Sequence, residues 1–82
     1  MYLNDVKHIV TDVLALGPAG DALTEHSALL GSIPELDSMA VVNLLTALEE
    51  HFGFAIDDDE ISAATFETLG TLAAFVQHKM AP

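Results

Sequence analysis

Apolar residues recur at helical spacing in three separate stretches of the chain, and this spacing is typical of amphipathic helices. The first stretch predicts a helix with Asn4 as its N-cap that continues to about Leu16, because Gly17-Pro18 cannot extend it. The last stretch predicts a helix that begins after the N-cap Thr68. The apolar residues that carry this spacing are Val6, Ile9, Val10, Val13, Leu14, Leu69, Leu72, Ala73, Val76 and Met80.

The middle stretch predicts the longest helix, Ser38–Phe52, with Asp37 as its N-cap and Gly53 as its stop. At about 100° per residue, one arc of this helix is apolar and is expected to face the core. That arc contains Val41, Leu44, Leu45, Leu48 and Phe52.

The connections between the helices are expected to pack on them. Residues 17–37 form a long first loop, which a domain of this size tolerates only if the loop is anchored. A connector at 54–56 leads to a short helix around Asp58–Ala63 with Ile61 turned inward, and Phe66 then reaches the core. The expected anchors of the long loop are Leu23, Leu29, Leu30, Ile33 and Leu36.

These segments predict a single domain over residues 1–82 with an all-α fold: a four-helix bundle with three main helices, a short third helix and a long first loop. The apolar fraction of 51% is enough for one core, and the chain contains no cysteine. We find no run of about 18 apolar residues and no secretory signal. The expected location is therefore the cytoplasm, without stable insertion into a membrane.

Charge is strongly unbalanced, since 13 acidic residues stand against two cations, Lys7 and Lys79, for a formal net charge of −11. This excess argues against binding to nucleic acid or to an anionic membrane. It favours attraction to partner proteins with basic patches. It also keeps a small apolar domain in solution, so composition alone leaves both interpretations open.

The start of the longest helix is the strongest candidate for chemistry. Asp37 is placed to cap the helix, and Ser38 follows near unpaired backbone amides and the positive end of the helix dipole. A phosphate bound or attached there would be stabilised. Met39 and Val42 are apolar and fall outside the core arc on the side of Ser38. They form either a docking surface for partner enzymes or a contact with the preceding loop.

In these features the chain resembles the acyl carrier protein family. The similarity covers the order helix, long loop, Asp-Ser and helix, and it extends to three further motifs: Leu48-Glu49-Glu50-His51-Phe52-Gly53, Ile56-Asp57-Asp58-Asp59-Glu60-Ile61 and Phe66-Glu67-Thr68-Leu69-Gly70-Thr71-Leu72. The resemblance implies a bundle of acyl-carrier type in which Ser38 carries 4′-phosphopantetheine from coenzyme A and Asp37 helps to position that serine. It implies a partner-facing surface formed by Met39, Val42, Glu49 and Glu50.

The resemblance further implies a carrier without catalytic activity of its own. It would hold acyl or aminoacyl groups as thioesters and act as a monomer with a phosphopantetheinyl transferase and with acyl-loading and acyl-transferring enzymes. Fatty-acid members of the family usually have acidic residues where this chain has Ala40 and Asn43. This departure favours a specialised, free-standing carrier in lipid, polyketide or related biosynthesis. The alternative is a degenerate bundle that only binds proteins and has no prosthetic group.

Other kinds of site are poorly supported by the sequence. Ser38 with His26 or His51 lacks the Gly-x-Ser-x-Gly turn of a hydrolase. The run Asp57-Asp58-Asp59-Glu60 lacks the spacing of a calcium-binding loop. The four histidines have no metal-ligand spacing. We therefore expect no catalytic residue and no metal site.

Overall fold

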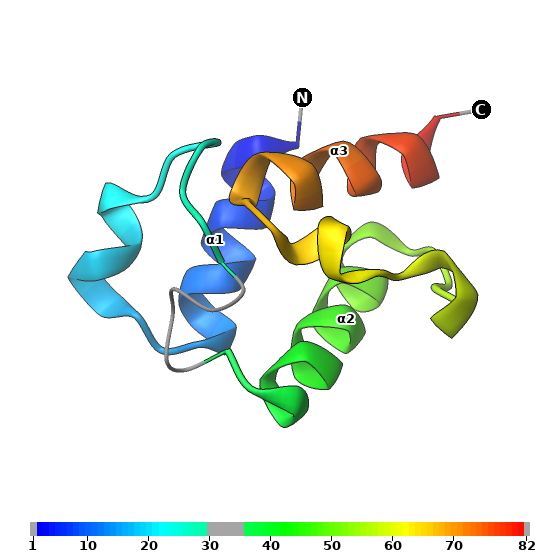
Figure 1. Ribbon diagram of the computed structural model, residues 1–82, viewed down its shortest axis with the longest axis horizontal. Helices are drawn as coiled ribbons and strands as arrows, with labels where there is room; N and C mark the ends of the chain where they lie inside the picture. Colours follow the sequence, from blue (N-terminus) through cyan, green and yellow to red (C-terminus); the bar gives the residue numbers. More distant parts are fainter. Residues whose placement is uncertain (1, 30–35, 82) are drawn as a thin grey trace.

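Three α-helices form the frame of the fold: α1 (Leu3–Val13), α2 (Ser38–Phe52) and α3 (Leu69–Met80) (Figure 1). The computed structural model describes residues 2–29 and 36–81. α1 packs against both other helices, and α3 crosses its first half. In the described parts of the connections between the α-helices lie three short 3-10 segments: η1 (Gly17–Ala22), η2 (Asp58–Glu60) and η3 (Ala63–Phe66). The predicted all-α class is confirmed, and no helix within the described ranges is both long and apolar enough to cross a membrane.

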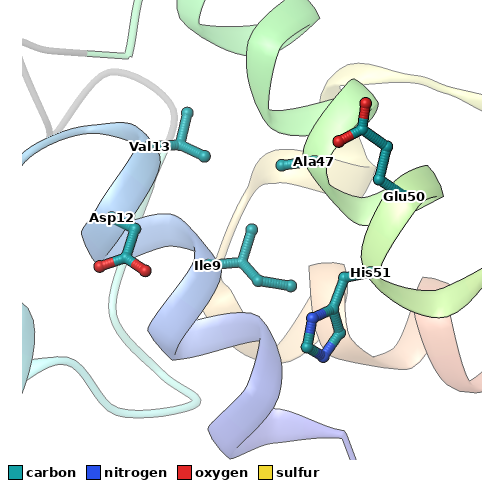
Figure 2. Close-up of a pocket in the computed structure, with 6 residues that line it drawn as sticks. All are labelled: Ile9, Asp12, Val13, Ala47, Glu50 and His51. Carbon is teal, nitrogen blue, oxygen red and sulfur yellow. The ribbon is translucent and has the colours of Figure 1, made fainter.

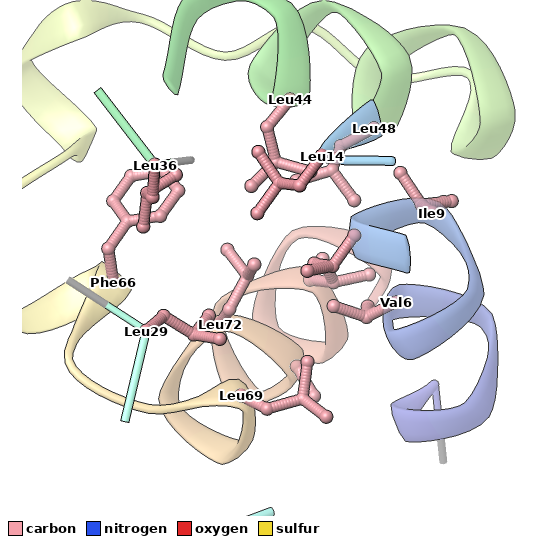
Figure 3. Packing of buried hydrophobic residues seen from close by; sticks show 13 residues of the cluster. Val6, Ile9, Leu14, Leu29, Leu36, Leu44, Leu48, Phe66, Leu69 and Leu72 are labelled. Carbon is pink, nitrogen blue, oxygen red and sulfur yellow. The ribbon is translucent and has the colours of Figure 1, made fainter. Parts of the chain in front are cut away.

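The core lies where the apolar faces of the three helices meet (Figure 3). Leu44 and Leu48 of α2 are fully buried, and the rest of the predicted arc of this helix is half-buried. Of the anchors expected in the long loop, Leu29 and Leu36 are buried and Leu23 is half-buried, while the predictions for Leu30 and Ile33 lie outside the described residues. The remaining buried side chains come from α1 and the residue after it, from η3 and from α3: Val6, Ile9, Val10, Leu14, Phe66, Leu69, Leu72, Ala73 and Val76.

The prediction of Asn4 as the N-cap of the first helix is wrong. The cap is Tyr2, whose carbonyl accepts from the Val6 amide at 2.9 Å and whose side chain makes no capping bond. Its ring packs edge-on against Phe52 at 5.4 Å between centroids. This contact with α2 holds the chain in place two residues before the polar residue that local preference would choose.

The same helix ends earlier than predicted, at Val13 rather than near Leu16. Ala15 adopts a left-handed backbone (φ 54°), and the Leu16 amide donates to the Thr11 carbonyl at 3.0 Å. A helix end that is closed by this hydrogen bond normally has glycine at the left-handed position. Because alanine stands there instead, the sequence contains no stop signal until Gly17, which is where the 3-10 segment η1 begins.

The predicted short helix around Asp58–Ala63 is replaced by the two 3-10 segments η2 and η3. Ser62 is extended (φ −141°, ψ 172°) and caps η3 in a reciprocal arrangement with Thr65. An extended residue cannot continue a helix, so the chain straightens at Ser62 and starts a new turn. Ile61 still packs against the core, as predicted.

The long first loop is fastened to the start of α3 by backbone hydrogen bonds. The Leu69 amide donates to the Ser27 carbonyl at 2.9 Å, and the Gly70 amide donates to the Glu25 carbonyl at 2.8 Å. These bonds satisfy first-turn donors that have no partner within the helix. Glycine is needed at position 70, because a Cβ there would lie 2.6 Å from the Glu25 carbonyl oxygen.

A second tie joins η2 to the last turn of α3. The Lys79 ammonium lies 2.7 and 2.9 Å from the two carboxylate oxygens of Glu60. One of these oxygens also accepts from the Asp57 amide at 2.8 Å. The Asp57 amide, and after it Lys79, hold the pKa of the Glu60 carboxyl below its usual range.

We expect Glu60→Gln to lower the stability of the fold at neutral pH but not in acid. A carboxyl whose pKa is lower in the folded chain than in the unfolded chain stabilises the fold fully above the unfolded pKa. This stabilisation disappears as the pH falls through the folded pKa. Thermal unfolding of both proteins between about pH 7 and pH 2 should show their melting temperatures converging on acidification. A gap that is independent of pH would contradict the assignment.

Candidate functional site

The candidate serine stands at the first position of α2, and local hydrogen bonds explain why the helix begins there. Asp37 is extended (φ −103°, ψ −174°), and its Oδ1 accepts from the Ala40 amide at 2.8 Å. The Asp37 carbonyl accepts from the Val41 amide at 2.9 Å, which is the first bond of the helical ladder. The predicted N-cap is confirmed, and Ser38 is exposed beside the first-turn amides.

A phosphate ester fits this position. The Ser38 side chain is exposed, and it sits at the positive end of a helix of 15 residues. Both cations of the chain are bound elsewhere: Lys7 donates to the Asp21 carbonyl at 3.1 Å, and Lys79 pairs with Glu60. Stabilisation of a phosphate by this chain would therefore come from the backbone of the first turn of α2.

Two large apolar side chains lie exposed next to Ser38. Met39 is 67% exposed and Val42 is 54% exposed, although the opposite face of the same helix packs on the core. Apolar side chains that are clustered and exposed often mark contact surfaces. The structure therefore places this pair where a partner that approaches Ser38 could cover it.

The two glutamates at the other end of α2 differ in their surroundings. The Glu49 carboxylate accepts from the Ile56 amide at 2.7 Å, which ties the end of α2 to the following connector. Glu49 is half-buried, whereas Glu50 is exposed. The structure thus assigns a fold-holding contact to Glu49 that the sequence did not indicate. Glu50 is the more accessible of the two charges.

A shallow pocket with a cavity volume of about 330 Å³ lies between α1 and α2 (Figure 2). Ile9 and Val13 of α1 and Ala47 of α2 form its apolar lining. The pocket is bordered by the polar side chains of Asp12, Glu50 and His51. Asp12 was not identified from the sequence, because one acidic residue on the outer face of a helix resembles any solvated charge.

The structure does not assemble the rival sites among the residues that it describes. His26 pairs with its neighbour Glu25 at 3.4 Å, and the His51 ring packs edge-on against Phe52 at 4.7 Å between centroids. No hydrogen bond joins either histidine to Ser38 within residues 2–29 and 36–81. In those same ranges no three potential metal-ligating side chains come together.

Comparisons with known proteins identify a family that matches most of the chain. A family model described as "Phosphopantetheine attachment site" matches residues 4–76. The chain is 35% identical over 75 residues to an acyl carrier protein from Sulfurovum sp. (strain NBC37-1). This alignment covers 92% of this chain and 93% of the relative. It is 64% identical to a holo acyl carrier protein from Nitrosomonas europaea, whose solution NMR structure superposes with a TM-score of 0.92 over 98% of this chain and 96% of that one.

Proposed function

The chain belongs to the acyl carrier protein family, whose members are non-catalytic carriers with a 4′-phosphopantetheine group, and we propose that Ser38 is the residue to which this group is attached. The observation that carries the proposal is the position of Ser38, exposed at the first turn of α2 directly after the cap Asp37. The bond to be formed is a phosphate ester on the Ser38 oxygen, which loses its proton. The bond to be broken is the pyrophosphate bond of coenzyme A, and adenosine 3′,5′-bisphosphate is the leaving group. Asp37 fixes the start of the helix and thereby the direction in which the serine points.

The group supplies a thiol on a flexible arm, and the thiol holds an acyl group as a thioester. The chain contributes no thiol, because it has no cysteine. An ordinary thiol with a pKa of about 8.5 is a good leaving group and requires no base on the carrier. The protein therefore needs only to display the arm and to be recognised by successive enzymes, a phosphopantetheinyl transferase first among them.

We further propose a specialised, free-standing carrier in lipid, polyketide or related biosynthesis. The support is the charge pattern of α2, which has no acidic residue from Ser38 to Leu48 and two acids at its end. Partner enzymes would contact the apolar pair Met39 and Val42 near the arm. They would contact carboxylates of α2 only at the far end of this helix. A single carrier domain over residues 1–82, action as a monomer and location in the cytoplasm stay predictions.

The experiment that tests the proposal is the intact mass of the purified chain before and after incubation with coenzyme A and a broad-specificity phosphopantetheinyl transferase. We expect a gain of one phosphopantetheine group. The absence of any gain with several transferases would contradict the proposal and favour a bundle that only binds proteins. Loading the modified protein with acyl and aminoacyl groups of different length would then compare the possible cargoes.

Reversing the exposed charge at Glu50 should slow modification. We expect Glu50→Lys to raise the KM of the transferase for the carrier on the order of 2- to 10-fold at low salt. The variant loses an exposed attraction and adds a repulsion. The effect should shrink at about 0.5 M salt, where charges are screened within a few Å. Glu67→Lys makes the same change at an exposed position outside α2 and is the matched control. An effect of Glu50→Lys that salt does not reduce would rule out electrostatic attraction.

A further inference from the structure

The pocket between α1 and α2 combines an apolar lining with acidic borders. Ile9 is buried, and Val13 and Ala47 are half-buried, so the lining is partly covered already and offers a small apolar surface. Figure 2 shows these three side chains directed into the space between the helices, with Asp12 on the α1 side and Glu50 on the α2 side. The carboxylates therefore stand on opposite borders of the same hollow.

The chain itself does not neutralise these borders with a lysine. Lys7 and Lys79 are its only lysine or arginine residues, and both are bound to other groups. The side chain near Asp12 is His8, at 3.4 Å, and both side chains are largely exposed, at 80% and 70%. The Asp12 carboxylate therefore remains accessible to a cation from another protein.

Glu50 links this pocket to the proposed partner-facing side of α2. It lies about 18 Å along the helix from Ser38, at about 1.5 Å per residue. A protein that binds at Ser38 can therefore reach the pocket without covering the serine. The pocket extends the same contact surface onto α1, a helix that contributes no residue to the partner-facing surface expected from the sequence.

We propose that the phosphopantetheinyl transferase binds this pocket with an amphipathic basic segment, an inference that rests on the function proposed above. An apolar side chain of the segment occupies the space over Val13 and Ala47. Lysine or arginine residues on either side of it pair with Asp12 and Glu50. Charge complementarity and the continuity with α2 select this occupant over a second copy of the chain, since two copies would bring carboxylates together in a protein of net charge −11.

The test is the steady-state kinetics of modification for Asp12→Asn, with coenzyme A saturating and the mass gain as the readout. Removing one exposed attraction should raise the KM for the carrier about threefold at low salt and leave kcat unchanged. Asp5→Asn removes the same charge from an exposed position of the same helix outside the pocket, and it should change KM less. Asp12→Asn combined with Glu50→Gln should raise KM about tenfold if the two contacts are independent.

A second variant tests the apolar part of the site. Ala47→Leu would fill the pocket without changing charge, and we expect a higher KM whose increase persists at high salt. Melting curves would show that each variant remains folded. An equal effect of Asp12→Asn and Asp5→Asn, or an unchanged KM for a folded Ala47→Leu, would overturn the proposal. Failure of every variant and of the parent chain to be modified would instead overturn the proposed function.

Discussion

We expect Ser38→Ala to abolish the mass gain on incubation with coenzyme A and a transferase, while the helical circular dichroism and the melting temperature should remain close to those of the parent. The first effect is complete because alanine has no hydroxyl to be esterified. The second is small because the Ser38 side chain is exposed, and the cap is supplied by Asp37. Substitutions at such exposed positions usually change stability by about 0.5 kcal/mol or less.

Thr46→Ala is the matched control for this variant. Thr46 is exposed on the same helix, and its hydroxyl donates only to the Val42 carbonyl, at 3.0 Å. The Thr46 variant should be modified like the parent, which would show that the reaction selects the start of α2 and not any hydroxyl on it. Modification of Ser38→Ala would mean that another residue carries the arm. A large loss of fold would mean that the serine is structural.

Leu48→Ala should cause a large loss of stability. Leu48 has no exposed surface and lies near Leu14 and Leu44 in the core (Figure 3). Removing a buried leucine side chain costs about 2–5 kcal/mol, because apolar contacts disappear and a cavity remains. Small domains are stable by only about 5–15 kcal/mol, so this change removes a large part of the total. Urea unfolding followed by circular dichroism measures it.

Met39→Ala on the same helix is the control for that loss. Met39 is 67% exposed, and its truncation should change the free energy of unfolding by about 0.5 kcal/mol or less. The same variant should instead weaken the reaction with the transferase, because Met39 belongs to the proposed docking surface. Equal losses of stability in the two variants would contradict the assignment of the core face of α2.

The bounds of α2 could be predicted from the sequence because its end signals are local. Asp37 accepts a hydrogen bond from an amide three residues later, and Gly53 takes the left-handed conformation (φ 73°) that ends the helix. The ends of α1 could not be predicted in this way. Its start is held by the packing of Tyr2 on Phe52, and its end has Ala15 in a conformation that usually belongs to glycine.

In the candidate site, too, the residue placed by a local signal could be predicted and the contacts made by packing could not. Ser38 could be identified because its position follows from the helix cap next to it. The different surroundings of Glu49 and Glu50 could not, since adjacent residues of one helix differ only by about 100° in direction. The contact of Glu49 with the Ile56 amide depends on how the connector after α2 turns back.

The sequence by itself determined the all-α class, the apolar faces of the three helices and the serine that begins α2, because periodicity, caps and stops act between residues a few positions apart. Only the tertiary structure decided which carboxylate remains accessible, where the long loop is fastened and that Asp12 and Glu50 border one pocket. These features join residues far apart in the chain. Their placement follows from how the helices pack, and no local pattern of residues records that packing.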